Sequence, residues 1–423
     1  MTPRTLTDWL SYAERVHPVG IDMGLDRVRE VAVRLDVLAP AKQNVVIAGT
    51  NGKGSTSIYL EALLLADGYT VGTTLSPHLN RFNERVRVNG ACVDDEVLSD
   101  AFASIEHARG AITLTYFEFG ILAALLVFKR SNVDVTVLEV GLGGRLDAVN
   151  IVTGSVTVIT SIGIDHVAYL GPDRESIGAE KAGILRRGVP CVYGEASIPT
   201  SIVDAARTID APLLRKGRDF NCHAGRDGWD FDGVCGGRPV HLRSLARPSV
   251  ALDNAATALQ ALLLLDARES PADLVAAAAR ARLPGRFEHF DYRGLTLIVD
   301  VAHNPHGAAF LSEQLRATQR DGLTIAVAGF LQDKDAAGIV AALDPAVDEW
   351  VFVDTEGARG QAAQMSAQKV RSTRPVTVAT DVLEHVIAAR ATQARPLDRV
   401  IVLGCFDLAQ RARAIMLRDG VRR

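Results

Sequence analysis

Cysteine is scarce in this sequence, and the few residues present are not arranged for a shared task. Cys92, Cys191, Cys222, Cys235 and Cys405 are scattered, odd in number and form no Cys-x-x-Cys pair. A disulfide framework needs an even set of cysteines, and a structural zinc site needs closely paired ones. The cysteine content therefore argues against both and indicates a reducing compartment.

Long hydrophobic runs are also missing. The N-terminal stretch MTPRTLTDWLSYAERVHPVG has no apolar core of the kind that marks a signal peptide. Apolar runs such as ALQALLLLDA are too short to cross a bilayer. These absences predict a cytoplasmic protein that does not act in a membrane.

The chain has no excess charge of one sign, because its formal net charge is −4 and its pI is about 6.2. This balance gives no electrostatic reason to expect nucleic acid as a partner. A composition that is 48% hydrophobic and 23% charged is typical of soluble globular proteins. A length of 423 residues predicts two domains.

Several apolar, β-branched runs each lead into a polar or glycine-rich turn and then into a helical pattern. The clearest are residues 44–49 (NVVIAG), 133–140 (VDVTVLEV) and 155–163 (SVTVITSIG). This alternation predicts a mainly parallel sheet wrapped by helices. Short alternations rich in Gly and Asp at about residues 215–245 predict a small antiparallel part within the same domain.

The strand–helix alternation restarts after residues 284–286 (PGR), with five apolar runs between Leu295 and Phe406. This pattern predicts a second, Rossmann-like α/β domain. No Gly-x-Gly-x-x-Gly loop follows its first strand, so we expect no dinucleotide site there. The boundaries that we expect are 1–287 for the first domain and 288–423 for the second.

Residues 49–55 (GTNGKGS) resemble a phosphate-binding loop, yet they lack the Walker spacing of four residues between the first glycine and Gly-Lys-Ser/Thr. The context is right, because an apolar strand precedes the loop and an amphipathic helix follows it. Glycines let backbone N–H groups approach phosphate, and the helix N-terminus favours anions. Lys53 would neutralise the outer phosphates and Ser55 would face magnesium. A plain strand–helix turn is the alternative, and a lysine amid three glycines weighs against it.

Polar residues follow other predicted strands at the sheet edge where ligands bind in open α/β folds. Glu139 is placed there as a magnesium carboxylate, and Asp165-His166 ends a neighbouring strand. Asp300 begins a comparable strand end, DVAHNP, in the second domain. Taken singly, each has a plain alternative: an exposed acid, a hydrogen-bonded histidine or simple turn chemistry. Taken alone, Lys181 would belong to an ordinary charged face of a helix.

Together these residues resemble the dihydrofolate synthase/folylpolyglutamate synthase family, a branch of the Mur ligase superfamily. The matching stretches run in the family's order over nearly the whole chain: 49–55 (GTNGKGS), 76–79 (SPHL), 82–85 (FNER), 115–118 (TYFE), 139–148 (EVGLGGRLDA), 165–166 (DH), 180–184 (EKAGI), 284–286 (PGR) and 300–305 (DVAHNP). Each is weak alone, and jointly they are specific. The irregular phosphate loop is this superfamily's own variant. We therefore expect an N-terminal P-loop ATPase domain, of the Mur ligase central type, and a C-terminal Rossmann-like ligase domain.

The resemblance implies a reaction. ATP phosphorylates a substrate carboxylate, the amine of L-glutamate attacks the acyl phosphate, and phosphate leaves as an amide forms. The acceptor would be dihydropteroate and also reduced folates, whose glutamate tail is extended. ATP and two magnesium ions are the implied cofactors, and a monomer is the implied state.

The resemblance also implies roles for particular residues. ATP would be held by Thr50, Asn51, Gly52, Lys53, Gly54, Ser55, Asn254, Arg286 and Asp300. Magnesium would be held by Ser76, Glu139, His166 and Lys181, the last carried as a carbamate (N6-carboxylysine). The catalytic residues would be Lys53, His166, Lys181 and His303. The pterin site would comprise Ile21, Asp22, Met23, Thr115, Tyr116, Phe117, Glu118, Leu146, Asp147 and Ala148.

The chain departs from the family near its C-terminus. Relatives commonly carry Gly-Ser where this sequence has Gly404-Cys405, followed by Phe406 and Asp407. A thiol is a weaker hydrogen-bonding group than a hydroxyl, and an Asp would repel the carboxylates of an incoming glutamate. We therefore assign no substrate-contact residues at this edge.

Two other functions compete with folate ligation. A Mur-type ligase acting on a cell-wall nucleotide precursor usually carries a further N-terminal domain, and the phosphate loop here starts near residue 49, which leaves no room for one. A P-loop NTPase switch would give no task to the 300–305 element of a second α/β domain. Glutamate- and pterin-dependent release of ADP would separate these functions.

Overall fold

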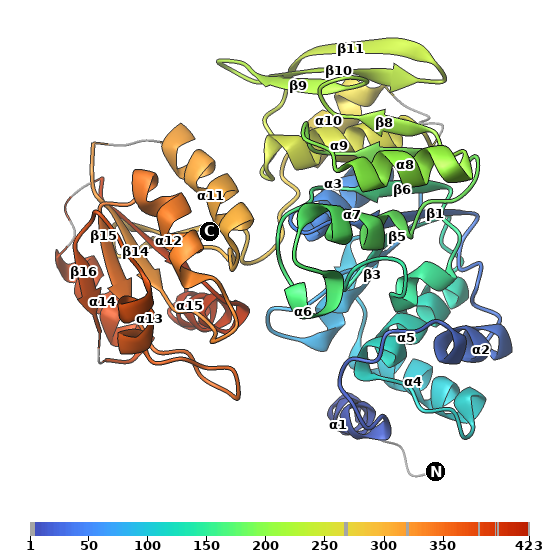
Figure 1. The fold of residues 1–423 in the computed structure, drawn as a ribbon, viewed down its shortest axis with the longest axis horizontal. Helices are drawn as coiled ribbons and strands as arrows, with labels where there is room; N and C mark the ends of the chain where they lie inside the picture. The colour runs from blue at the N-terminus through green and yellow to red at the C-terminus, as the bar shows by residue number, and fades with distance from the viewer. Residues whose placement is uncertain are drawn as a thin grey trace. The chain divides into compact units, whose positions relative to one another are not determined.

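The computed structural model describes residues 5–265, 270–318, 321–379, 381–393, 395 and 397–421. The chain divides into two compact units, residues 1–282 and 283–423, and both are α/β (Figure 1). The boundary expected from the sequence instead places residues 283–287 in the first domain.

The first unit is built on an eight-stranded, mostly parallel sheet, which confirms the predicted architecture. Its strand order is β4-β3-β2-β5-β1-β6-β7-β8, and the β2–β3 and β3–β4 pairs are antiparallel. The strands are β1 Gln43–Ala48, β2 Val71–Thr74, β3 Val86–Val88, β4 Ala91–Cys92, β5 Val135–Glu139, β6 Val156–Ile159, β7 Cys191–Tyr193 and β8 Leu213–Arg215.

Helices cover both faces of this sheet (Figure 1). Those described in the first unit are α1 Leu6–Val16, α2 Asp26–Arg34, α3 Lys53–Ala66, α4 Asp95–Arg109, α5 Tyr116–Arg130, α6 Val167–Leu170, α7 Arg174–Ala182, α8 Thr200–Ile209, α9 Leu252–Leu262 and α10 Pro271–Ala278, with the short 3-10 helices η1 Phe82–Arg85 and η2 Ala148–Ile151. No helix of the described residues is long and apolar enough to cross a membrane.

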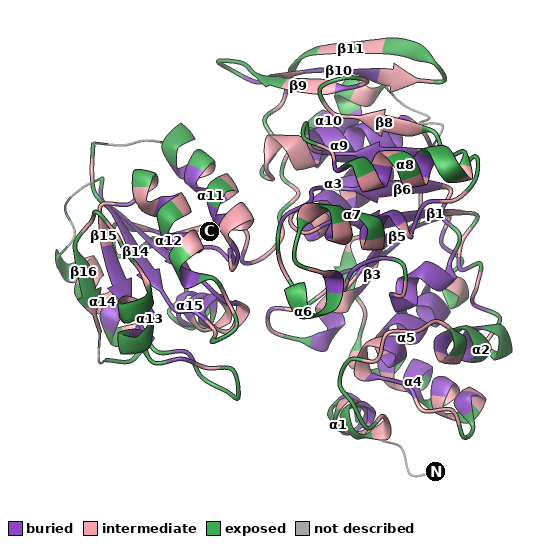
Figure 2. Ribbon diagram, viewed as in Figure 1, coloured by how far each residue is buried: buried purple, intermediate pink, exposed green. Residues whose placement is uncertain are grey.

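Successive residues of the central strands enter two different cores. In β1, Val45 and Ile47 pack against α3, α9 and α10, whereas Val46 and Ala48 face the core of α1, α2, α4 and α5. Side chains alternate between the faces of a strand, so a continuous apolar run is what a sheet covered on both faces requires. The central strands are accordingly buried along almost their whole length (Figure 2).

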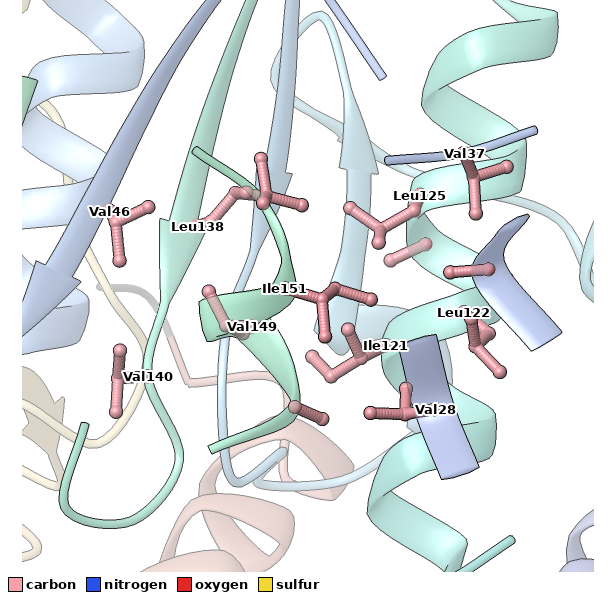
Figure 3. Packing of buried hydrophobic residues seen from close by; sticks show 14 of the residues in the cluster. Val28, Val37, Val46, Ile121, Leu122, Leu125, Leu138, Val140, Val149 and Ile151 are labelled. Carbon is pink, nitrogen blue, oxygen red and sulfur yellow. The ribbon is translucent and has the colours of Figure 1, made fainter. Parts of the chain in front are cut away.

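Figure 3 shows the second of these cores from close by. Val149 and Ile151 of η2 lie between strand side chains, such as Leu138, and those of α5 (Figure 3). Helix α5 begins at a capping box, in which the Thr115 side chain accepts from the Glu118 backbone and the Glu118 carboxylate accepts from the Thr115 backbone. This cap sets where the helix starts, so the TYFE stretch lies at its N-terminus.

The predicted antiparallel part is a three-stranded sheet, with β9 Asn221–Ala224, β10 Trp229–Cys235 and β11 Arg238–Leu245 in the order β11-β10-β9. The first three alternate residues of β10, Trp229, Phe231 and Gly233, are buried. The two aromatic rings contribute to the core shared with α9. The sheet therefore closes the α9 side of the unit.

The second unit is a six-stranded α/β sheet with the order β12-β13-β17-β14-β15-β16. Its strands are β12 Glu288–Tyr292, β13 Leu295–Val299, β14 Thr324–Ala328, β15 Glu349–Phe352, β16 Val376–Val378 and β17 Arg399–Leu403. Its described helices are α11 Pro305–Ala317, α12 Ala336–Leu343, η3 Asp344–Ala346, α13 Ala363–Lys369, α14 Leu383–Gln393 and α15 Phe406–Arg418. The five predicted strand regions are present, and β12 is an additional strand, antiparallel to β13, that the sequence analysis did not predict.

Candidate active site

The phosphate loop joins the carboxyl end of β1 to the start of α3, as predicted. Gly49 and Gly52 have φ values of +149° and +86°, and Gly52 is the N-cap of α3. Residues after β6 hold the loop from one side: Thr50 N–H donates to Ser161 O at 2.8 Å, and Asn51 N–H donates to Ser161 Oγ at 3.3 Å. The loop is thus anchored to a neighbouring strand, which keeps the helix N-terminus open for an anion.

Asn254, at the start of α9, lies against this loop. A Cβ atom placed on Gly52 would lie 2.4 Å from Asn254 Oδ1. Fold contacts therefore bring together two of the expected ATP residues that are separated by two hundred positions in the sequence. The close approach requires glycine at position 52 both for its φ and for space.

We expect Gly52→Ala to weaken ATP binding by about 10- to 100-fold, because it would displace Asn254 and shift the loop. Gly68→Ala is the matched control, since Gly68 has a similar φ of +80° but nothing within 4 Å of its added Cβ. Both variants should lose about 1 kcal/mol of stability from backbone strain. Calorimetric ATP titrations separate the effects, and equal ATP affinities for the two variants would contradict this account.

Two lysines converge on one backbone carbonyl of the loop. Lys53 Nζ donates to Gly49 O at 3.0 Å, and Lys181 Nζ, from α7, donates to the same oxygen at 2.9 Å. Burial, followed by the charge of Lys53, lowers the pKa of Lys181 to about 7. At neutral pH a large fraction of Lys181 is therefore the neutral amine, a form that an ordinary surface lysine hardly populates.

Glu139 and Ser76 meet at the carboxyl edge of the same sheet. Glu139 ends β5, is paired in register with Ile47 of β1, and is buried. Its Oε2 accepts from the Ser76 backbone N–H at 3.0 Å, and both residues line a small cavity. A carboxylate next to a hydroxyl supplies hard oxygen ligands, which fit magnesium.

These residues cannot form a complete metal cage. Among the described residues, no group of three or more His, Cys, Asp or Glu side chains could hold a metal ion. Magnesium commonly keeps several waters and takes other ligands from substrate phosphates. Glu139 and Ser76 beside a phosphate loop fit that mode of binding.

We expect Glu139→Gln to raise the magnesium concentration needed for half-maximal activity by about 10- to 100-fold. Pterin affinity should change little, because Glu139 does not line the larger cavity. Glu118→Gln is the crossed control and should weaken pterin binding while leaving the magnesium titration unchanged. An unchanged magnesium curve for Glu139→Gln, with only pterin affinity lost, would identify Glu139 as a substrate residue instead.

A cavity of about 270 Å³ opens in the first unit beside these residues. It is lined by all the predicted pterin residues except Tyr116, namely Ile21, Asp22, Met23, Thr115, Phe117, Glu118, Leu146, Asp147 and Ala148. Ser76 and His166, both expected to hold magnesium, also line it. The cavity therefore brings together residues expected to bind an organic substrate and residues expected to bind metal.

The carboxylates of this cavity are held by hydrogen bonds. Asp22 Oδ2 lies 2.7 Å from Arg27 Nη1 and 3.0 Å from His17 Nε2, and Arg27 Nη2 reaches Glu118 Oε1 at 3.2 Å. Asp147 accepts from the backbone N–H groups of Leu142 and Val149, while burial raises its pKa to about 6. These contacts fix two of the loops that line the cavity.

His166 lies at the N-cap of the short helix α6 with a left-handed φ of 52°. Its side chain is exposed, and its backbone N–H donates to the Asp165 carboxylate at 2.8 Å. The left-handed backbone turns the chain sharply, so His166 reaches the cavity although its strand ends several residues earlier.

In the second unit, Arg286, Asp300 and His303 gather at the carboxyl end of β13. Asp300 is buried and accepts from the backbone N–H groups of Phe287 and Ala302 at 2.8 and 2.7 Å. Burial raises its pKa, against the opposing charge of Arg286. His303 Nδ1 lies 2.8 Å from Val301 O, which orients its ring.

The departure at residues 404–407 has a structural account. Cys405 is the N-cap of α15, and its sulfur accepts from Leu408 N–H at 3.4 Å, so the thiol keeps a capping role. The centre of the Phe406 ring lies 5.4 Å from the guanidinium carbon of Arg286 and 5.6 Å from the ring centre of His303. Asp407 lies 3.7 Å from Arg411, which offsets part of its charge.

Arg85 is a lining residue that the sequence analysis missed. It is the last residue of the FNER stretch, and it lines both cavities. Nothing local marks it, because Arg81 and Arg87 lie close by in the sequence and pair with acids elsewhere. Tyr116, expected in the pterin site, instead supports Arg85, whose guanidinium carbon lies 5.6 Å from the centre of its ring.

The fold and the site define a class of protein. Residues 47–191 match the Mur ligase middle domain family, and residues 285–406 match the family described as Mur ligase, glutamate ligase domain. A phosphate loop in the first and polar strand ends in the second are the features that these matches contain. The class is that of the Mur ligases.

Comparison with individual proteins narrows the class. The chain is 45% identical over 401 residues to a dihydrofolate synthase/folylpolyglutamate synthase of Escherichia coli, covering 95% of this chain and 93% of the relative. Escherichia coli FolC in complex with DHPP and ADP has a TM-score of 0.91 at 42% identity, covering 99% of both chains. A bifunctional folylpolyglutamate synthase/dihydrofolate synthase with Mn, AMPPNP and L-glutamate bound has a TM-score of 0.89 at 45% identity, covering 98% of both chains. This chain belongs to the dihydrofolate synthase/folylpolyglutamate synthase family.

Proposed function

We propose that this protein is an ATP-dependent ligase that joins L-glutamate to dihydropteroate, forming dihydrofolate, and to reduced folates, extending a polyglutamate tail. The observation that carries the proposal is the cavity of the first unit. Its lining combines the residues that resemble a pterin site with Ser76 and His166, next to a phosphate loop. Family membership supports the same reaction class.

The chemistry of the cavity suits a flat, partly polar ring. Ile21, Met23 and Phe117 supply apolar walls, and Asp22 and Asp147 supply acceptors for ring N–H groups. A small number of fixed polar groups among apolar walls is the usual way in which a pocket orients a small molecule. The Arg27 contacts with Asp22 and Glu118 support this by holding the acceptors in place.

The proposed reaction has two steps. A carboxylate oxygen of the substrate bonds to the γ-phosphorus of ATP while the bond from that phosphorus to ADP breaks, and ADP leaves with the electron pair. The glutamate nitrogen then bonds to the acyl carbon, phosphate leaves with its electron pair, and the nitrogen loses a proton to solvent. The activation is required because a carboxylate is a poor acyl donor at neutral pH.

Different residues of the chain would bind the phosphates, the metal ions and the rest of the nucleotide. Lys53 and the backbone of residues 50–55 would bind the phosphates, with Asn254 next to them. Ser76 and Glu139 would hold one magnesium ion, and His166 with carbamylated Lys181 a second. When bound, such ions neutralise phosphate charge. Relatives in complex with ADP, or with AMPPNP and Mn, support nucleotide and divalent-metal binding.

The proposal also assigns roles to three residues of the second unit. Arg286 and Asp300 would contact ATP, and His303 would act near the transferred phosphate or the incoming glutamate. These residues lie at one strand end, and Arg286 and His303 both contact the Phe406 ring, which supports a shared task. A P-loop switch would leave this cluster and the glutamate ligase domain match without a role.

One assay tests the function. Purified protein is incubated with ATP, magnesium, L-glutamate and either dihydropteroate or tetrahydrofolate, and products are read by mass. We expect an amide product with stoichiometric ADP for at least dihydropteroate. Release of ADP that does not depend on a pterin substrate, or product formation only with a cell-wall nucleotide precursor, would refute the proposal.

A further inference from the structure

The larger cavity has one cationic side chain of fixed charge in its wall. Of the residues that line it, Arg85 is the only lysine or arginine, whereas three are acids: Asp22, Glu118 and Asp147. The acids are already engaged by Arg27, His17 or backbone N–H groups. An anionic substrate group entering this cavity therefore meets one guanidinium among several carboxylates.

Arg85 is held firmly without an acidic partner. Its Nε donates to His78 Nδ1 at 2.7 Å, and its guanidinium carbon lies 5.6 Å from the ring centres of both Phe82 and Tyr116. Within the described part of the chain, it forms no ion pair. An arginine stacked on aromatic rings keeps its planar fork in one orientation.

Glu84 and Glu139 are the two carboxylates whose charges act on Arg85, and both accept hydrogen bonds from the backbone. Glu84 accepts from the N–H groups of residues 79, 80 and 81, at 2.7 to 3.1 Å. Glu139 accepts from Ser76 N–H at 3.0 Å. Since neither pairs with Arg85, the terminal nitrogens of the guanidinium remain available to a ligand anion.

The position of Arg85 along the cavity indicates which anion it meets. Arg85 lines the larger cavity together with the expected pterin residues, and it lines the smaller one together with Ser76 and Glu139. A substrate whose ring lies among the pterin residues would direct its carboxylate toward the end that holds the expected magnesium residues. Because Arg85 lines both cavities, it lies at the junction between them.

We propose that Arg85 is a catalytic residue that binds the substrate carboxylate at this junction and stays on one of its oxygens through both steps of the reaction. The inference rests on the proposed function. In the first step the other oxygen attacks phosphorus. When the glutamate nitrogen then bonds to the acyl carbon, the electron pair of the C=O bond moves onto the retained oxygen, and Arg85 stabilises that charge. The charge returns to the C=O bond as phosphate leaves with its electron pair.

The test compares two ligands that differ only at the carboxyl group, which is an anion in one and a neutral amide in the other. Dissociation constants are measured for dihydropteroate and for its carboxamide, without ATP or magnesium, for the wild type, Arg85→Gln and Arg81→Gln. Arg81 is the matched control, because it belongs to the same loop, pairs with Asp95 and does not line the cavity. We expect Arg85→Gln to lose about 10- to 100-fold in affinity for the acid and little for the amide, a loss typical of a charged hydrogen bond.

The outcomes separate the inference from the function. Equal losses for acid and amide, or no loss for either, would overturn the role of Arg85 and leave it a structural residue of the aromatic cluster. If circular dichroism shows that Arg85→Gln does not fold, Arg85→Lys gives the same comparison, with a smaller selective loss expected for the acid. A wild-type protein that neither binds dihydropteroate nor ligates glutamate would instead refute the proposed function.

Discussion

Lys53→Ala is expected to reduce ATP-dependent glutamate ligation by at least about 100- to 1,000-fold while leaving the fold intact. Lys53 is the first residue of α3, and its ammonium is held over the loop by the carbonyls of Gly49 and Thr50, at 3.0 and 3.3 Å. Phosphoryl transfer places charge on oxygens at this position, and removing one preorganised donor commonly has an effect of this size.

The control for Lys53→Ala is Lys42→Ala, because Lys42 is an exposed lysine just before β1, the strand that leads into the phosphate loop. Thermal denaturation checks the folding of both variants, and product mass under saturating ATP reports activity. Near-normal turnover with normal ATP affinity in Lys53→Ala would refute the assignment of residues 49–55 as the phosphate loop.

Lys181→Ala is expected to be inactive or nearly so, losing about 100-fold or more, as when a metal-binding shell is disrupted. Lys181 is buried, and its Nζ reaches the phosphate loop at Gly49 O. Burial is the main reason that its pKa falls to about 7, and repulsion by Lys53 adds to it. The neutral amine is the form that reacts with carbon dioxide, so the lowered pKa of Lys181 favours this reaction.

Carbamylation joins the neutral amine to carbon dioxide and releases one proton, so its rate should rise with pH through about 7, where Lys181 loses its charge. The product is an anion with oxygen donors, which magnesium prefers to imidazole nitrogen. The carbamate would therefore supply the hard ligand that His166 lacks. Like charge from Lys53 disfavours the ammonium and favours this anion.

Two measurements decide whether Lys181 is modified. A high-resolution crystal structure should show three further heavy atoms beyond the Lys181 amine. Short carboxylates such as acetate should partly restore activity to Lys181→Ala and should not restore Lys53→Ala, whose defect concerns phosphate. A bare amine in the density together with full activity of Lys181→Ala would remove this residue from the mechanism.

Local sequence patterns predicted the elements that depend on neighbouring residues. Apolar β-branched runs ending in polar or glycine-rich turns predicted the strands β1, β5 and β6. A strand that is buried on both faces needs apolar side chains at successive positions, and this pattern is visible in the sequence. The strand β12 escaped prediction, because its residues, EHFDY, alternate weakly and gain their place only by pairing with β13.

The roles of particular residues were reached by resemblance rather than by pattern. Spacing alone indicated a phosphate loop around Lys53 and a strand-end acid at Glu139, and left Lys181 as an ordinary helix residue. Arg85 was overlooked because its stacking on Phe82 and Tyr116 and its place on the cavity wall have no counterpart in the letters around it.

Sequence patterns alone were enough to predict that two α/β units follow one another and that a glycine-rich loop joins a strand to a helix. These features depend on side-chain periodicity and on backbone freedom over a few residues. Folding brings Lys181 to Lys53 at Gly49 O, sets Asn254 against Gly52 and places a single arginine in the cavity wall. Strand order, and helix packing between distant segments, set those meetings, and the burial that shifts the pKa of Lys181 exists only once the chain has closed around it.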